Sequence, residues 1–462
     1  MEYKNENRII ELEITSYGSE GQGVGRLDGL AVFVKGALLG ERVRARITKT
    51  APRFAEARLI EVLDKSQNRL EPACPNFDRC GGCDLMHMNY AHQLEFKRMK
   101  VENAFRRIGS FDNIEVRSCA ASAQTLRYRN KAVFSFAQQG ARVISGTLGE
   151  KSHWVIETAD CLLQNEASLK ALETVTEWAN DFGIPAYNEK TGKGVLRHLA
   201  VRSTCTGEIM VIIIAAARLK NEAELVSRLV SAVSGIKSIV VNLNRERSSL
   251  IMGRKSVLLW GKEAITERIL GMDFAVAAES FLQINHDQTE RLYSFAVNSL
   301  ELNKNDSAID LYCGIGTLSL LMAKSAGSVT GIEYVPRAIE NAKNNAQANG
   351  IKNADFHCGA AEKLLPELVK SGKRVSKLLL DPPRAGAMKP ALDAIIKCAP
   401  ERIAYVSCDP ATLARDCKIL VNEGGYVIEC IQPFDMFPQT EHVESVVLMT
   451  RSIDCKYENN RN

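Results

Sequence analysis

The stretch SAIDLYCGIGTLSLLMAKSA, residues 307–326, decides the fold class of the carboxyl-terminal part of the chain. An apolar run of strand length is followed by a glycine turn and then by an apolar stretch of helical length. The same order of strand and turn returns at 328–350, at 375–386 and at 402–416. Strands that alternate with helices at this spacing predict an α/β fold with a parallel, doubly wound, Rossmann-like sheet.

The glycine turn in this stretch is a candidate nucleoside site. Gly314 and Gly316 lie between the predicted strand and helix, and Glu333 ends the next strand, 17 residues beyond Gly316. A carboxylate at that place can accept both hydroxyls of a ribose. Leu318 and Ser319 follow instead of the third glycine of the dinucleotide motif, which favours a nucleoside without a pyrophosphate, such as S-adenosylmethionine. Glycines that serve only a tight turn are the alternative.

Asp381 and Cys408 each follow a predicted strand of this sheet, at the edge where open α/β sheets bind ligands. Asp409 is a suitable N-cap and Pro410 a suitable first residue for the helix after Cys408. We therefore expect the Cys408 thiol at the positive end of a helix dipole, with a pKa below its ordinary value. The alternative for Asp381 is a plain turn that happens to contain an aspartate. The alternative for Cys408 is a packing residue, because free cysteines are usually buried and inert.

Glu444 directly precedes the apolar stretch SVVLM at 445–449. A carboxylate at the entrance of a strand can be an exposed charge without a role. If Glu444 faces Cys408, the two side chains form a nucleophile and a base.

The rest of the chain predicts two further domains. Residues 1–63 alternate with period two between glycine turns, which predicts a small OB-like β-barrel, and residues 64–265 read as a central α+β domain before the Rossmann-like domain at 266–462. In ERVRARIT, residues 41–48, the arginines share one strand face, as an oligonucleotide-binding barrel requires. A solvated edge strand is the alternative.

The cysteines and the apolar runs indicate a cytoplasmic protein. Thirteen cysteines in a long chain argue against a disulfide framework, and the polar start MEYKNENR lacks the apolar core of a signal peptide. The longest apolar run, at 209–217, is too short to span a membrane. Cys74, Cys80 and Cys83 have the spacing C-x5-C-x2-C, which by itself leaves zinc, an iron-sulfur cluster and coincidence open.

Five motifs resemble those of bacterial uracil-5 RNA methyltransferases, and the first 63 residues look like the TRAM domain of several members. The motifs are FLQIN at 281–285, DLYCGIGT at 310–317, LDPPRAG at 380–386, YVSCDPATLARD at 405–416 and DMFPQTEHVE at 435–444. The resemblance implies that Cys408 is the nucleophile that adds to carbon 6 of uracil and that Glu444 is the base that removes the proton on carbon 5. It also implies that the cofactor S-adenosylmethionine is bound by Gln283, Tyr312, Glu333 and Asp381, beside the Gly314 and Gly316 turn.

The same resemblance implies a 4Fe-4S cluster on Cys74, Cys80, Cys83 and Cys161, with a structural or RNA-positioning role. It implies that residues 93–124 pack with the catalytic domain, and that the substrate is a uridine of 23S ribosomal RNA, because tRNA-specific relatives usually lack the TRAM domain and the cluster cysteines. No obligate protein partner is expected. The alternatives are a tRNA uridine-5 methyltransferase and a non-catalytic RNA-binding protein with a vestigial methyltransferase domain.

Overall fold

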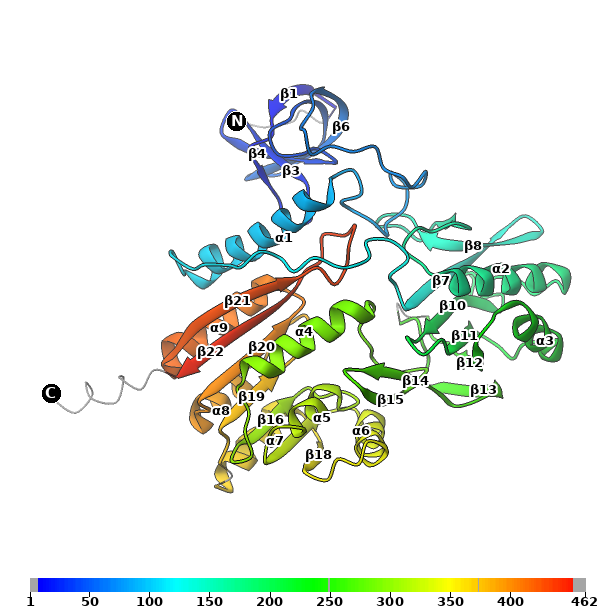
Figure 1. Ribbon diagram of the computed structural model, residues 1–462. Coiled ribbons are helices and arrows are strands. Elements are labelled where there is room, and N and C mark those ends of the chain that lie inside the picture. The colour runs from blue at the N-terminus through cyan, green and yellow to red at the C-terminus, as the bar shows by residue number, and fades with distance from the viewer. Residues whose placement is uncertain (1–6, 248–249, 373, 452–462) are drawn as a thin grey trace.

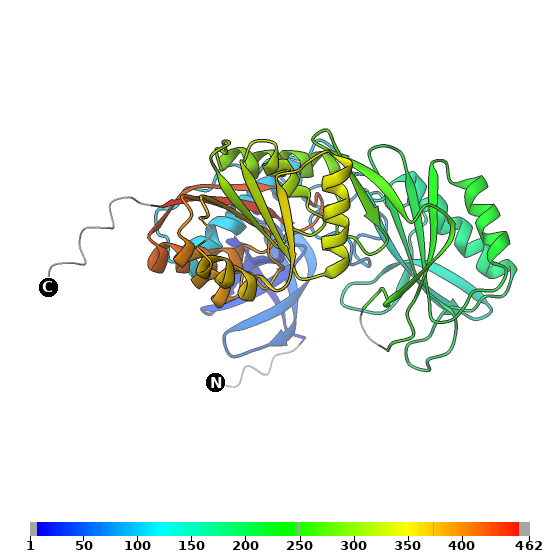
Figure 2. The same cartoon turned by 90° about the horizontal axis from the view of Figure 1, so that it is seen from below.

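The computed structural model describes residues 7–247, 250–372 and 374–451, whose strands form three large sheets and one hairpin (Figure 1). Seen from below, the central part of the chain and the carboxyl-terminal part stand side by side (Figure 2). No helix in the described part of the chain is long and apolar enough to cross a membrane.

The amino-terminal strands form a six-stranded sheet in the order β1-β5-β6-β4-β3-β2. After β1, the Thr15 N–H donates to the carbonyl of Val24 on β3 (3.0 Å), which curls the sheet toward the predicted barrel. These strands are β1 (Ile9–Glu13), β2 (Ser16–Tyr17), β3 (Gly23–Leu27), β4 (Leu30–Lys35), β5 (Arg42–Thr50) and β6 (Phe54–Asp64).

The outer face of β5 is less basic than its sequence predicts. Alternate residues of β5 are buried, as expected for a strand with one packed face. The exposed Arg42 side chain pairs with Asp64 (2.7 Å), and that of Arg44 pairs with Glu11 (2.8 Å) and Glu61 (2.7 Å). Acidic side chains of β1 and β6 therefore neutralise part of the charge that a count along β5 alone assigns to this face.

The next helix packs against the carboxyl-terminal domain. Asn89 caps α1 (Tyr90–Ala104), which continues into a π-helical turn, η1 (Phe105–Gly109). Val101 and Phe105 are buried in the same apolar cluster as Leu413 of the last helix. The structure ends α1 in this wider π turn and a left-handed Ser110 (φ 61°).

The central sheet has seven strands in the order β13-β12-β11-β10-β7-β8-β9, with both of its helices packed in one apolar cluster. The apolar run at 209–217 forms its fully buried strand β11, which explains the hydrophobicity of that run. The hairpin β14 (Ala264–Ile269) and β15 (Met272–Ala277) leads to the carboxyl-terminal domain. The remaining elements are β7 (Lys131–Gln139), β8 (Arg142–Leu148), β9 (Val155–Glu157), α2 (Glu166–Asp181), β10 (Leu196–Ser203), β11 (Ile209–Ala215), α3 (Glu222–Ala232), β12 (Ile236–Leu243) and β13 (Lys255–Gly261).

The carboxyl-terminal sheet has the order β18-β17-β16-β19-β20-β22-β21 and is the predicted doubly wound sheet. Its strands are parallel except β22, which runs against both β20 and β21. The order reverses between β16 and β19, and ligands bind at the carboxyl ends of strands at such a switch point. The strands are β16 (Ser307–Leu311), β17 (Ser328–Glu333), β18 (Ala354–Cys358), β19 (Lys377–Leu380), β20 (Arg402–Ser407), β21 (Tyr426–Phe434) and β22 (Glu444–Arg451).

Two apolar clusters cover the two faces of this sheet. Helices α4 (His286–Ser299), α5 (Thr317–Ala323) and α6 (Pro336–Ala348) contribute to one cluster. Helices α7 (Ala361–Lys370), α8 (Lys389–Cys398) and α9 (Pro410–Gly424) contribute to the other, together with α1. Burial on both faces makes the strands continuously apolar, so that their polar residues stand out at the strand ends.

Candidate active site

Tyr312 and Asp381 lie at the switch point of the sheet. Each directly follows its strand, and the Asp381 N–H donates to the carbonyl of Leu311 (3.3 Å), which holds the two strand ends together. Tyr312 has a φ of 65°, a left-handed conformation that costs a non-glycine residue energy. Its N–H donates to the carbonyl of Ile332 (2.8 Å), so that the strained turn is tied to the neighbouring strand β17.

The glycine turn and Glu333 are joined directly. One Glu333 carboxylate oxygen accepts the Gly314 N–H (3.2 Å) and the other accepts the Val335 N–H (2.9 Å). Gly316 has a φ of 85°, and a Cβ there would approach the Phe356 ring to 3.1 Å, so glycine is required. A Cβ at Gly314 would meet no atom within 4 Å, which shows that the turn faces open space. The turn thus presents an oriented carboxylate beside room for a ligand.

Asp310, the residue before the end of β16, was not singled out from the sequence. Its Oδ2 accepts the Ser319 hydroxyl (2.6 Å), whereas its buried Oδ1 has no hydrogen-bond partner among the described residues. Burial raises the pKa of Asp310 to about 7. Ser319 stands where the dinucleotide motif has its third glycine, and its bond to Asp310 gives that departure a physical reason. The feature of the sequence that could have identified Asp310 is its position as a polar residue inside the apolar run AIDL.

Cys408 and Glu444 lie next to each other at the same edge of the sheet. Strands β20 and β22 are antiparallel, and their paired residues include Ser407 opposite Ser445. The next residues along this register are Cys408 and Glu444. Glu444 is 3% exposed, and its Oε2 has no hydrogen-bond partner among the described residues. The buried carboxylate is therefore free to accept a proton at this edge.

The environment of Cys408 differs from the prediction in one respect. Asp409 caps α9 as predicted, since its side chain accepts the Thr412 N–H (2.8 Å). Burial, and then the charge of Glu444, nevertheless raise the pKa of Cys408 to about 11, although Arg384 opposes the shift. The expected lowering of this pKa is therefore wrong, because desolvation and nearby carboxylates outweigh the helix dipole.

The two carboxyl groups of the site also have shifted pKa values. Burial raises the pKa of Asp381 to about 7, and burial together with Asp381 raises the pKa of Glu444, against the opposing charge of Arg384. The raised pKa of Glu444 makes its carboxylate a stronger base than an exposed glutamate. Arg384 was not predicted as a site residue. The feature of the sequence that could have identified Arg384 is its place directly after the two prolines of LDPPRAG.

Gln283 lies just before α4 and is buried at 5% exposure. Its backbone carbonyl accepts the Asn130 side-chain amide (2.9 Å), and Asn285 caps the helix that follows. Burial, and then Asp381 and Glu444, raise the pKa of Tyr293 on α4, so this helix packs close to the two carboxyl groups. The FLQIN segment thus connects the central domain to the helix beside the site.

A buried ion pair holds the segment that leads to Glu444. The Lys97 ammonium of α1 lies 2.5 Å from the Asp435 carboxylate, with both side chains fully buried, and it also donates to the Phe437 carbonyl (3.0 Å). Gln93 and Gln439 exchange two hydrogen bonds (3.0 and 3.1 Å). The Gln439 carbonyl accepts the N–H groups of residues 84 and 85, directly after Cys83. The segment before Glu444 is therefore fastened to α1 and to the cysteine-rich loop.

The four cysteines assigned to a cluster line one pocket. Arg129 and apolar side chains of residues 77, 86, 162 and 163 line it as well. Burial raises the pKa of the Cys83 thiol, and the other three thiols act in the same direction, so the four groups interact. Within the described part of the chain, no three of these sulfur atoms lie within 4.8 Å of one another. A tetrahedral zinc ion would need its sulfur ligands about 3.8 Å apart. Each cysteine of a 4Fe-4S cluster binds a different iron, so the sulfur atoms around a cluster lie farther apart.

Comparison with known proteins supports a relation to RNA methyltransferases. Residues 89–452 match the family model of tRNA (uracil-5-)-methyltransferases, and residues 4–60 match the TRAM domain. Residues 61–88, which carry Cys74, Cys80 and Cys83, lie between the two matches. A protein of Caldanaerobacter subterraneus described as an uncharacterized RNA methyltransferase is 42% identical over 443 residues, 96% of this chain and 98% of its own. A Clostridium tetani protein with the same description is 40% identical over 452 residues, 97% and 98% of the two chains.

A solved structure is similar over the same length. The crystal structure of Pyrococcus abyssi tRNA (uracil-54, C5)-methyltransferase in complex with S-adenosyl-L-homocysteine has a TM-score of 0.76 and 27% sequence identity. The match covers 96% of this chain and 100% of that chain. The arrangement of sheets and helices described above is therefore shared with an enzyme of known crystal structure.

Proposed function

Since the chain belongs to the tRNA (uracil-5-)-methyltransferase family, we propose that it methylates carbon 5 of a uridine in 23S ribosomal RNA, with S-adenosylmethionine as methyl donor and a covalent bond from Cys408 to the uracil. The observation that carries this proposal is the adjacent placement of Cys408 and Glu444 on the register of β20 and β22. A nucleophile and a base thus meet at the sheet edge that also holds Asp381 and the glycine turn.

The residues at the switch point fit the methyl donor. Glu333, oriented by two backbone N–H groups, would accept the ribose hydroxyls, and the open space at Gly314 leaves room for the nucleoside. Tyr312, Asp381 and Gln283 would complete the site. When bound, S-adenosylmethionine supplies a methyl group on a positively charged sulfonium. Asp381, whose pKa burial raises to about 7, is a carboxyl group that such a charge favours in its ionised form.

In the proposed reaction, the protein's own side chains act in three steps. The Cys408 sulfur, once deprotonated, bonds to carbon 6 of the uracil, and the electron pair of the carbon 5–carbon 6 double bond becomes an enolate. Carbon 5 of the enolate then bonds to the methyl group of the donor, and the carbon–sulfur bond of that methyl group would break to leave S-adenosylhomocysteine, a neutral thioether. Glu444 removes the proton from carbon 5, the double bond forms again, and the sulfur–carbon bond breaks to free Cys408. The uridine must leave its stack for the sulfur to reach carbon 6.

The choice of 23S ribosomal RNA rests on the amino-terminal sheet and on the four-cysteine pocket, which the resemblance associates with rRNA-specific relatives. The structurally similar tRNA (uracil-54, C5)-methyltransferase matches 96% of this chain, so tRNA is the competing substrate. The choice is tested with 23S ribosomal RNA and tRNA from cells that lack the gene, each incubated with the enzyme and S-adenosylmethionine and digested to nucleosides. We expect 5-methyluridine from the 23S ribosomal RNA. Formation in tRNA alone would contradict the substrate, and bound RNA without any methylation would support the non-catalytic alternative.

We also propose that Cys74, Cys80, Cys83 and Cys161 hold a 4Fe-4S cluster, which would fasten the loop that contacts Gln439. Protein purified without air is expected to contain about four iron and four sulfide atoms per chain. Replacing Cys161 by serine should remove most of both, whereas replacing the exposed Cys358 by serine should remove neither. Stoichiometric zinc in place of iron would refute the cluster.

A further inference from the structure

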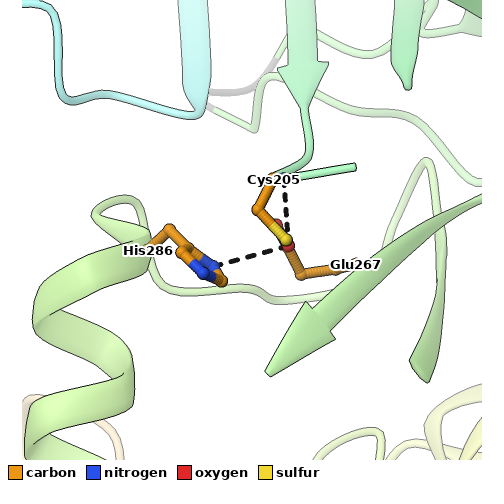
Figure 3. A group of neighbouring side chains, drawn as sticks. All are labelled: Cys205, Glu267 and His286. Atoms are coloured by element: carbon orange, nitrogen blue, oxygen red, sulfur yellow. Dashed lines mark hydrogen bonds and ion pairs between the residues drawn. The ribbon is translucent and has the colours of Figure 1, made fainter. Parts of the chain in front are cut away.

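Three side chains from three separate elements converge at the junction of the central sheet and the carboxyl-terminal domain (Figure 3). Cys205 lies in the turn between β10 and β11, Glu267 lies on β14, and His286 is the first residue of α4. One ligand atom from each, a sulfur, an oxygen and a nitrogen, lie within 4.8 Å of one another. None of the three residues belongs to the four-cysteine pocket or to the methyl-transfer chemistry assigned above.

The Glu267 carboxylate is the buried centre of this group. The side chain is fully buried, and its Oε1 accepts the N–H groups of Cys205 (3.1 Å) and Arg268 (3.0 Å). Its Oε2 is buried without a hydrogen-bond partner among the described residues. The Arg268 side chain pairs instead with Asp273 (2.7 Å). A buried carboxylate requires a positive partner, and a bound metal ion is one way to provide it.

Both ring nitrogens of His286 face carboxylate groups. Its Nδ1 lies 3.4 Å from Glu267 Oε1, on the side of the cysteine. Its Nε2 lies 3.8 Å from Glu290 Oε1, which itself accepts the Leu270 N–H (2.7 Å). Histidine ligands commonly present their second ring nitrogen to a carboxylate, which sets the tautomer. Cys205 is exposed, so an ion can enter from solvent.

We propose that Cys205, Glu267 and His286 form a binding site for one zinc ion. A thiolate, an imidazole and a carboxylate are the donors that zinc takes in proteins, whereas magnesium and calcium take oxygen ligands alone. Three protein ligands leave the fourth tetrahedral position to water. The ion would fasten the β10–β11 turn to β14 and to the start of α4, three residues after Gln283.

The site is tested with full-length protein purified without air, so that the four-cysteine pocket keeps its native content. The protein is stripped of loosely bound metal, incubated with one equivalent of zinc chloride, passed through a desalting column, and analysed for zinc and iron in the same sample. We expect about one zinc per chain for the wild type, and an increase in the melting temperature on zinc addition. If the wild-type protein retains no zinc, the proposal is wrong, and no variant is needed to show it.

Two variants and a matched control locate the ion. Cys205→Ser and His286→Asn are each expected to lose the zinc and the zinc-dependent increase in melting temperature, with unchanged iron content. Cys358→Ser, which alters another exposed cysteine, should bind zinc as the wild type does. Unchanged zinc in both Cys205→Ser and His286→Asn would place the ion elsewhere and overturn the assignment. The iron measurement shows whether each variant has kept its fold around the cysteine pocket.

Discussion

Replacing Cys408 by alanine is expected to lower the rate of 5-methyluridine formation by at least about 10⁴-fold, because carbon 5 of uracil is a poor nucleophile until a thiolate adds to carbon 6. The measurement is the amount of 5-methyluridine formed per unit time with saturating S-adenosylmethionine. RNA binding should persist, because the substitution removes one small side chain from the site and leaves the Asp409 cap of α9 in place.

RNA that carries 5-fluorouridine at the target isolates the bond to Cys408. Fluorine on carbon 5 cannot leave as a proton does, so the wild type should form an adduct with the RNA that survives denaturation. The Cys408→Ala variant should form none. Cys417→Ala is the matched control, since Cys417 lies on α9, the helix that follows Cys408, and is fully buried away from solvent, and it should form the adduct. An adduct in Cys408→Ala, or none in a wild type that binds the RNA, would contradict the mechanism.

Replacing Glu444 by glutamine is expected to stop release of the RNA rather than its attachment. Without the carboxylate, the proton on carbon 5 has no acceptor, so turnover should fall by about 10²- to 10⁴-fold. Attack by Cys408 should proceed, because the charge of Glu444 is one cause of the raised pKa of that thiol and glutamine removes it. The variant should therefore accumulate a covalent complex with ordinary uridine RNA, seen as a slow band in a denaturing gel.

Glu441 provides the control for this substitution. It lies three residues before Glu444 in the same segment and pairs with Lys100 and His442 instead of facing Cys408. Glu441→Gln is expected to turn over without an accumulated complex. If Glu444→Gln turned over at the wild-type rate, Glu444 would not be the base. If it formed no adduct even with 5-fluorouridine RNA, its role would lie in the attachment step.

Local signals in the sequence were sufficient to predict strands β16, β17, β19, β20 and β22 of the carboxyl-terminal sheet and the residues at their ends, but not β18 or β21. The turn at Gly314 and Gly316, the strand that ends at Glu333 and the helix start at Asp409 each depend on a few neighbouring residues, and the structure has all three. Buried parallel strands are apolar throughout, so a polar residue at their carboxyl end is visible in the sequence itself. Arg384 and Asp310 were missed because their role depends on what surrounds them.

Charge is where the sequence and the structure differ most. Counting residues along β5 predicts a basic face, but Glu11 and Glu61 of neighbouring strands pair with Arg44. A helix start predicts an acidified Cys408, but burial and Glu444 raise its pKa. In both cases the deciding groups are distant in the sequence and become neighbours only through strand pairing.

The sequence by itself determined the chemical groups of this protein and the local elements that carry them: a thiol before a helix cap, a carboxylate before a strand, and a glycine turn. Only the tertiary structure decided which of these groups meet. The pairing of β20 with β22 sets Cys408 beside Glu444, and the buried contact of Lys97 with Asp435 holds the approach to that pair. The physical reason is that register and desolvation are properties of packed surfaces, to which residues hundreds of positions apart contribute together.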